Sequence, residues 1–205
     1  MTIPDVAPAA SARERTLNAA YELFSRRGIR AVGTDEVIER AGVARATLYR
    51  HFAAKNDLVL AVLRRHEELW THGLIEAQSE LRGATTEEQL LAIFDVLHDW
   101  FQLRDGFEGC SFINVLLEFG ADHPAGQACV AHIDHVRDIV RTRAAAAGLT
   151  DVEDFASSWH ILMKGAIILA AVGDRDAALR AQKMARSLIR EHQPATVVSA
   201  DEVAV

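Results

Sequence analysis

Apolar residues recur at intervals of three and four positions along almost the whole chain, and stretches in which apolar and polar residues alternate are scarce. Intervals of three and four place side chains on one face of an α-helix, whereas strict alternation is typical of a strand. The sequence therefore predicts an all-α fold. No segment of about twenty to fifty residues repeats, which argues against a helical solenoid.

Residues that start and stop helices divide this pattern into separate elements. A first helix, with apolar residues from Leu17 to Phe24, is expected to end at Gly28, and two short helices are expected on either side of Gly42. The remaining expected helices span residues 55–81, 86–105, 112–119, 125–147, 151–172 and 174–192.

The segment from Thr34 to Phe52 predicts a helix-turn-helix. Thr34 is expected to cap the first of the two short helices, and Asp35 and Glu36 suit the positive end of its dipole. Its inward face is formed by Val37, Ile38 and Ala41. Gly42 then allows the chain to turn, because glycine accepts the left-handed backbone that often ends a helix.

The second short helix is basic and aromatic on its outward side. Leu48 and Phe52 lie one turn apart and are expected to pack inward. The side chains left to meet something outside are those of Arg45, Thr47, Tyr49, Arg50 and His51. Such groups suit phosphates and base edges. Gly42 alone is weak evidence for a turn between helices, and Tyr49 could instead be buried. The helix-turn-helix prediction therefore depends on the ordered combination of these features over residues 34–52.

This segment resembles the TetR family of transcriptional regulators, whose DNA-reading pattern is T-x-x-x-I-A-x-x-A-G-V-S-x-G-T-L-Y-x-H-F with a Lys a few residues later, here Lys55. The resemblance is specific from Arg13 to Leu63. It implies that base edges are approached by Arg45, Ala46, Thr47 and Arg50. It also implies that phosphates are held by Thr34, Tyr49, His51 and Lys55.

Two departures from the family pattern affect the start of the second short helix. The family has a capping Ser where this chain has Ala44, which removes about 1 kcal/mol of local helix stability unless a phosphate supplies it. The usual Gly before Thr47 is Ala46, whose methyl group could contact a thymine. Both changes lie where base edges would be read, so they affect which bases this helix prefers.

The charge distribution supports a polyanionic partner for the N-terminal segment. From Ser11 to Lys55 there are nine basic and five acidic residues, a balance of +4, in a chain whose formal total is −7, so that the remainder carries −11. Neutralising phosphates releases counterions and supplies most non-specific DNA affinity. Some of Arg26, Arg27 and Arg30 could simply solvate a helix end, but that does not explain the asymmetry.

The length of 205 residues accommodates a small module and one larger core. We expect a DNA-binding domain at 11–54, a helical regulatory and dimerisation domain at 55–193, and disordered tails at 1–10 and 194–205. No apolar run is long enough to cross a bilayer and no secretory signal is visible, which indicates a cytoplasmic protein. Cys110 and Cys129 are expected as buried apolar groups in a reducing compartment.

The apolar stripe of the helix expected at 151–172 is too wide for a single partner. The residues expected to face the body of the protein are Phe155, Trp159, Leu162 and Leu169. A second contact, made by Met163, Ile167 and Ala170, would suit a homodimer, as the resemblance also implies, and two copies could read a palindromic operator. The alternative is that both stripes belong to the core of one chain.

The larger domain offers aromatic walls for a small-molecule pocket, with polar groups that could orient a ligand. The candidate residues are His66, Trp70, Phe94, His98, Trp100, Phe101, Phe112, Asn114, His132, Trp159 and Met163. For each of them, membership of an ordinary core is the simpler alternative. The effector is expected to be largely apolar or aromatic.

A metal site is another function that the larger domain could have. Cys129, His132 and His135 recur every three residues, and His123 or Cys110 could complete a metal shell. This spacing is weaker evidence than paired Cys-x-x-Cys motifs, so no metal is expected, and the metal or redox role of these residues stays open. No catalytic group or cofactor-binding loop is visible. The sequence thus favours a dimeric, ligand-released DNA-binding repressor over a helical binding protein or enzyme without gene control.

Overall fold

The computed structural model describes residues 10–103 and 109–195, and every regular element in these ranges is a helix. The predicted all-α fold is therefore confirmed for the described residues. The described residues divide into two compact units, one formed by residues 10–69 and 110–133 and the other by residues 70–103, 109 and 134–195. This is a division by packing, and the expected functional boundary between residues 54 and 55 stays a prediction.

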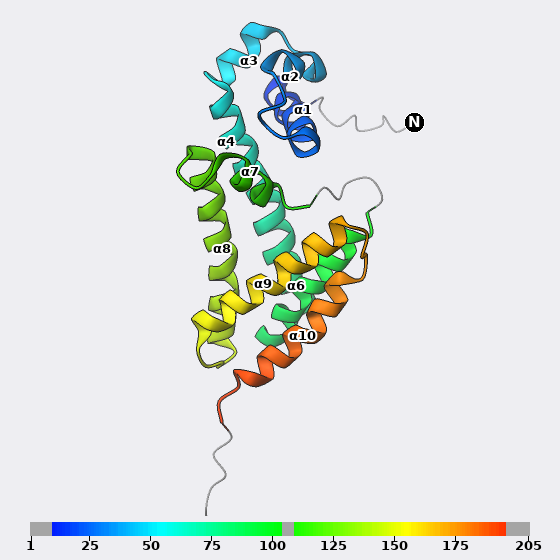
Figure 1. Ribbon diagram of the computed structural model, residues 1–205, viewed down its shortest axis with the longest axis vertical. Coiled ribbons are helices and arrows are strands. Elements are labelled where there is room, and N and C mark those ends of the chain that lie inside the picture. The colour runs from blue at the N-terminus through cyan, green and yellow to red at the C-terminus, as the bar shows by residue number, and fades with distance from the viewer. Residues whose placement is uncertain (1–9, 104–108, 196–205) are drawn as a thin grey trace, which may run out of the picture. The chain divides into compact units, whose positions relative to one another are not determined.

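The first unit contains the N-terminal helices and a helix from the middle of the chain (Figure 1). Its elements are α1 (Ala12–Arg27), α2 (Thr34–Ala41), α3 (Arg45–His51), α4 (Lys55–His66), α7 (Ser111–Phe119) and the beginning of α8 (Pro124–Ala146). Ser11 caps α1 by accepting a hydrogen bond from the Glu14 amide at 3.2 Å. The predicted first helix and its end at Gly28 are confirmed.

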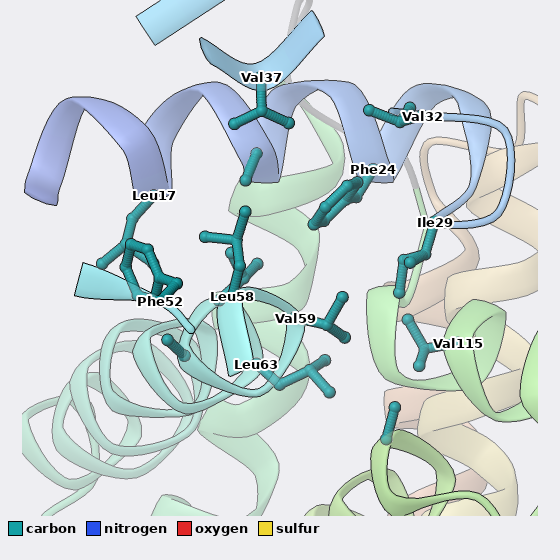
Figure 2. Close-up of a cluster of buried hydrophobic side chains, with 14 of the residues drawn as sticks. Leu17, Phe24, Ile29, Val32, Val37, Phe52, Leu58, Val59, Leu63 and Val115 are labelled. Atoms are coloured by element: carbon teal, nitrogen blue, oxygen red, sulfur yellow. The ribbon is translucent and has the colours of Figure 1, made fainter. Parts of the chain in front are cut away.

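The core of the first unit joins α7 to the N-terminal helices. The side chains of Phe24, Ile29 and Val59 converge with that of Val115 from α7 (Figure 2). Leu17 and Phe52 extend the same cluster towards α3. Burying such side chains stabilises the folded state by about 1.5–3 kcal/mol each. The helix-turn-helix thus shares one hydrophobic core with α7.

The second unit contains most of η1 (Glu67–Glu76), which it takes from Trp70 onward, together with α5 (Ala77–Arg82), α6 (Thr86–Phe101), the end of α8, α9 (Val152–Ala171) and α10 (Ala177–Glu191). Figure 1 shows α6, α9 and α10 packed side by side. Thr85 and Glu88 form a capping box at the start of α6. The buried guanidinium of Arg143 donates to Ser79 Oγ at 2.6 Å and to the Glu76 carbonyl at 3.0 Å, which fastens α8 to η1 and α5.

Several element boundaries differ from the expected ones. The helix expected over 55–81 is interrupted by the π-helical segment η1, because backbone hydrogen bonds reach one residue further there. The last helix begins at Ala177 rather than Asp174, whose carboxylate instead binds Arg180 at 2.5 Å. The expected end of α6 near residue 105 and nearly all of both tails lie outside the described residues.

The expected orientation of α9 was wrong. Met163, Ile167 and Ala170, assigned to a dimer contact, are 2%, 5% and 4% exposed and belong to the core of the chain. Leu169, expected to face the body, is 49% exposed, whereas Phe155 and Trp159 are buried as expected. The exposed side of α9 carries Ile161, Ile168, Leu169 and Val172. No helix in the described ranges is long and apolar enough to cross a membrane.

Candidate nucleic-acid interface

The connection between α2 and α3 is built on Gly42. Its backbone is left-handed, with φ 60° and ψ 43°, and its amide donates to the carbonyls of Ile38 and Glu39. A residue with a side chain would be strained in this conformation, so glycine lets α2 end and the chain turn at once. The predicted hinge is confirmed.

Helix α3 has a buried side and an exposed side, as the sequence predicts. Leu48 is completely buried and Phe52, just after the helix, is 3% exposed. The exposed residues are Arg45, Ala46, Tyr49, Arg50 and His51, and Thr47 is half-buried. The side chains proposed to meet DNA thus lie on the outward side of a helix that two inward residues hold in place.

The two short helices differ in how they begin. Ala44 precedes α3 and supplies no side-chain cap, as expected. Thr34 was expected to cap α2, but the N-cap residue is Gly33 and Thr34 is the first residue of the helix. The prediction was wrong by one position, and the Thr34 hydroxyl instead lies 3.4 Å from the hydroxyl of Tyr49. Two groups expected to hold phosphate are therefore neighbours.

Acidic partners compensate part of the positive charge of this segment. Arg27 pairs with Glu36, and Arg45 pairs with Asp35. Arg40 binds Glu22 at 2.6 Å, and this hydrogen bond lowers the pKa of the Glu22 carboxyl. In the part of the chain that the structure describes, the guanidinium of Arg50 has no hydrogen bond or ion pair. Arg50 is consequently free to meet a phosphate or a base.

Lys55 lies at the start of α4 and is half-buried. Its ammonium group donates to the Ile29 carbonyl at 2.6 Å, so it is tied to the connection between α1 and α2. An ammonium group has three N–H donors, and two of them remain for a phosphate. The position is compatible with the expected phosphate contact, which stays a prediction.

The last turn of α7 binds the connection between α1 and α2. The carboxylate of Glu118 accepts hydrogen bonds from the amides of Ile29 at 3.0 Å and Arg30 at 2.6 Å. The Arg30 guanidinium lies 5.0 Å from the ring centre of Phe119, within reach of a cation-π contact. Sequence reasoning missed Glu118, because its partners are 88 and 89 residues away in the chain.

A cavity of about 320 Å³ opens beside this contact in the first unit. Its walls come from α1, α4 and α7 and are largely apolar, with Val59, Leu63 and Val115 among them. Polar groups of Ser25, Asn114 and Glu118 also line it. Of the residues assigned to a ligand pocket from the sequence, Asn114 is the one that lines this cavity.

The other pocket candidates of the first unit form a stack of rings. His66 is buried, with its ring centre 5.2 Å from those of Tyr21 and Phe112. Phe112 in turn stacks on His132 at 3.4 Å. Burial lowers the pKa of His66 to about 4, since the charged form would lose its hydration. A neutral imidazole is therefore part of this core.

The pocket candidates of the second unit also contact one another. Trp70 and Trp100 lie 4.5 Å apart between ring centres, and Phe94 and Trp159 lie 5.1 Å apart. Phe101 and Met163 are buried, and His98 lies 3.3 Å from the Gln102 amide. The set predicted as one pocket is thus divided between the two units.

The cysteines and histidines of α8 are not gathered into a metal site. Among the described residues, no group of three or more His, Cys, Asp or Glu side chains is placed to hold a metal ion. Cys129 is buried, and burial, followed by the nearby Cys110, raises the pKa of its thiol to about 12. His135 instead packs its ring 4.7 Å from that of His72.

Known proteins resemble this chain over the helix-turn-helix and beyond it. The family model described as bacterial regulatory proteins, tetR family, matches residues 16–62. The HTH-type transcriptional activator FasR of Mycolicibacterium smegmatis is 35% identical over 163 residues, which are 72% of this chain and 71% of that protein. The HTH-type transcriptional repressor ComR of Escherichia coli is 30% identical over 102 residues, 50% of this chain and 48% of that protein.

Solved structures share the fold over nearly the whole chain. The crystal structure of SCO4454, a TetR-family transcriptional regulator from Streptomyces coelicolor, superposes with a TM-score of 0.83 at 28% identity and covers 90% of this chain and 91% of that one. The matching helix-turn-helix, the extended similarity to FasR and this common fold agree. The chain belongs to the TetR family and is a DNA-binding transcriptional regulator with a helix-turn-helix.

Proposed function

We propose that the protein is a dimeric repressor that a small molecule releases from a palindromic operator. The observation that carries the DNA-binding part is the outward side of α3, where Arg45, Thr47 and Arg50 stand over the buried Leu48. A short helix presented in this way fits the major groove, where base edges can be read.

The proposed contacts fall into two groups. Arg45, Ala46, Thr47 and Arg50 read base edges, and Thr34, Tyr49, His51 and Lys55 hold phosphates. The neighbouring hydroxyls of Thr34 and Tyr49 support the second group, because two donors 3.4 Å apart can share one phosphate oxygen. Support for the first group is the exposure of Arg45, Ala46 and Arg50.

The proposed dimer uses the exposed apolar side of α9 together with α10. Ile161 is 71% exposed, and Val172 and Met184 are also exposed. A groove of about 420 Å³ runs between the two helices and is lined by Ser158, Ile161, Leu162, Met184, Ser187, Leu188 and Glu191. Large exposed apolar side chains grouped on one face are typical of a subunit interface. A twofold axis there would give each protomer the same contact.

The proposed effector is small and largely apolar or aromatic. We place its site in the domain formed by residues 55–193, and the support for this is the largely apolar cavity of about 320 Å³ in the first unit, which Val59, Leu63 and Asn114 line. To release DNA, it has to bind more tightly to a conformation that no longer fits the operator, with a coupling of about 1–3 kcal/mol on the usual scale. Neither a cofactor nor a catalytic step is part of this proposal, and the site of action is the cytoplasm.

DNA binding is tested with the full-length protein and fragments of the DNA beside its own gene, by fluorescence anisotropy over a range of salt concentrations. Wild type is expected to prefer one fragment. Arg45→Ala should lose about 1–3 kcal/mol of discrimination at particular base pairs, whereas Lys55→Ala should weaken binding to all fragments and reduce the salt slope by about one. Arg82→Ala, which removes an exposed charge from α5, outside both α3 and the proposed dimer surface, is the matched control.

The sign of regulation needs a separate measurement. FasR is named an activator and ComR a repressor, so relatives carry both names. Transcription in vitro from the preferred fragment is expected to fall when the protein is added. If transcription rises instead, the protein is an activator and the proposed repression is wrong. If the protein binds all of these fragments without sequence preference, the regulatory proposal is refuted for them.

A further inference from the structure

The two arginines on the outward side of α3 differ in their partners. Arg45 donates from Nη2 to Oδ1 of Asp35, which lies in the first turn of α2. The side chains of Arg45 and Asp35 stay 62% and 72% exposed, so the pair lies on the surface. The guanidinium of Arg50, on the same helix, has no partner among the described residues. One of the two arginines proposed to read bases is thus held by a partner.

We propose that Asp35 is a specificity-determining residue that positions Arg45 for reading a guanine. The inference rests on the proposed function of α3. A guanidinium has five N–H groups in a plane, and a guanine takes two of them on O6 and N7. With one N–H held by Asp35, the plane of the Arg45 guanidinium is oriented while its other N–H groups remain exposed. An oriented side chain loses less conformational freedom on binding and tolerates fewer alternative bases.

Asp35 favours the reading of one base through Arg45, but it weakens binding to DNA of any sequence. Its carboxylate lies on the same side of the helix-turn-helix as Arg45 and repels phosphates, which reduces non-specific affinity. An exposed ion pair adds little to the stability of the fold, so the pair is not explained by stability alone. The carboxylate therefore lowers the affinity for all DNA but increases the ratio between the affinity for the preferred site and the affinity for other sequences.

Glu36 offers a matched control for the charge of Asp35. It lies in the same turn of α2 and also pairs with an arginine, but its partner is Arg27 of α1. Glu36→Gln removes one carboxylate from the same helix end without touching α3. Any effect of Asp35→Asn that Glu36→Gln shares belongs to charge or to the helix dipole, and the remainder belongs to Arg45.

The experiment uses the full-length protein and a preferred site obtained by selection from randomised duplexes. Anisotropy gives affinities for this site, for the site with each base pair changed in turn, and for poly(dI-dC). Asp35→Asn is expected to bind poly(dI-dC) about two- to fivefold more tightly. It should also lose about five- to tenfold of discrimination at one base pair in each half-site. Glu36→Gln should keep that discrimination, and Asp35→Glu should restore part of it.

A double-mutant cycle identifies the arginine through which Asp35 acts. Asp35→Asn should cost no further discrimination in an Arg45→Ala background and its full cost in an Arg50→Ala background. Equal costs in both backgrounds, or unchanged discrimination in Asp35→Asn, overturn the inference while the preference of wild type upholds the proposed function. A wild-type protein without any preferred site overturns both. Asp35→Ser, with thermal unfolding of each variant, replaces Asp35→Asn if that variant does not fold.

Discussion

The carboxylate of Glu118 lies directly against Gly28. A Cβ atom placed on Gly28 would be 3.3 Å from Oε2 of Glu118, and the backbone there has φ +79° and ψ 157°, a conformation that side chains rarely adopt. The same carboxylate binds the next two amides of the chain. Glycine therefore serves two purposes here, since it permits the backbone conformation and lets α7 approach the end of α1.

Gly28→Ala is expected to lower the free energy of unfolding by about 1–3 kcal/mol, because the new methyl group both strains the backbone and crowds Glu118. Gly148→Ala is the control: Gly148 also has positive φ, but no atom lies within 4 Å of the position that a Cβ would occupy there. Urea unfolding measures both. A loss in Gly28→Ala no greater than that in Gly148→Ala would show that the contact with Glu118 contributes nothing.

Glu118→Ala should release the connection between α1 and α2. The amides of Ile29 and Arg30 lose their acceptor, and a hydrogen bond to a charged group contributes about 1.5–3 kcal/mol. Hydrogen exchange at these two amides should accelerate, while Glu118→Gln, which keeps a side-chain oxygen, should preserve much of the protection. Unchanged exchange in Glu118→Ala would contradict the contact.

His66 makes stability depend on pH. Its pKa is about 4 in the folded chain and 6.5 in the unfolded chain, so between these values only the unfolded chain binds the proton. The free energy of unfolding should therefore fall as pH is lowered from 6.5, and the loss should be complete below pH 4. At about 1.4 kcal/mol per pKa unit, most of a total of about 3 kcal/mol is lost by pH 5.

His66→Phe keeps a ring between Tyr21 and Phe112 but cannot bind a proton. Urea unfolding at pH 7 and pH 5 should show a difference about 2 kcal/mol smaller in this variant than in wild type. His51→Gln changes an exposed ring and should behave as wild type. If wild type and His66→Phe lose the same stability, the buried neutral imidazole is not the cause.

The dimer proposal predicts that charge on the exposed side of α9 separates the subunits. Ile161→Glu and Leu169→Glu should shift the protein to a monomer in sedimentation experiments, since burying an unpaired carboxylate at an interface costs several kcal/mol. Leu81→Glu changes a side chain on α5 that is 79% exposed and should leave the assembly unchanged. A wild-type monomer, or an intact Ile161→Glu dimer, would contradict the proposed interface.

The helix-turn-helix could be predicted from the sequence because its determinants are local. Gly42 alone provides the left-handed turn, and Leu48 and Phe52 define the inward side of α3 within five residues. Helix α9 could not be oriented in the same way. Apolar residues surround most of it, so periodicity does not say which side meets the core, and Met163 and Leu169 were placed on the wrong sides.

The polar contacts that tie elements together were beyond sequence reasoning for a different reason. Glu118 is the one charged residue of α7, which marks it as unusual, but nothing near it in the chain indicates the amides it binds. Asp35 was explained fully by the helix dipole, and its pairing with Arg45 depends on how α2 and α3 cross. Phe94 contacts Trp159 in one unit and His66 contacts Phe112 in the other, and the pocket proposed from these residues stays a prediction.

Helix α3 has seven residues, no side-chain cap at its start and a covalent neighbour, Phe52, that anchors its end. A helix of two turns is not stable by itself, so its shape is imposed by what lies beneath it. The outward residues can therefore be exchanged for others with little effect on folding. Within one unchanged scaffold, a few substitutions on this face could change the DNA sequence that the protein prefers, which makes the regulator a suitable starting point for engineered gene circuits.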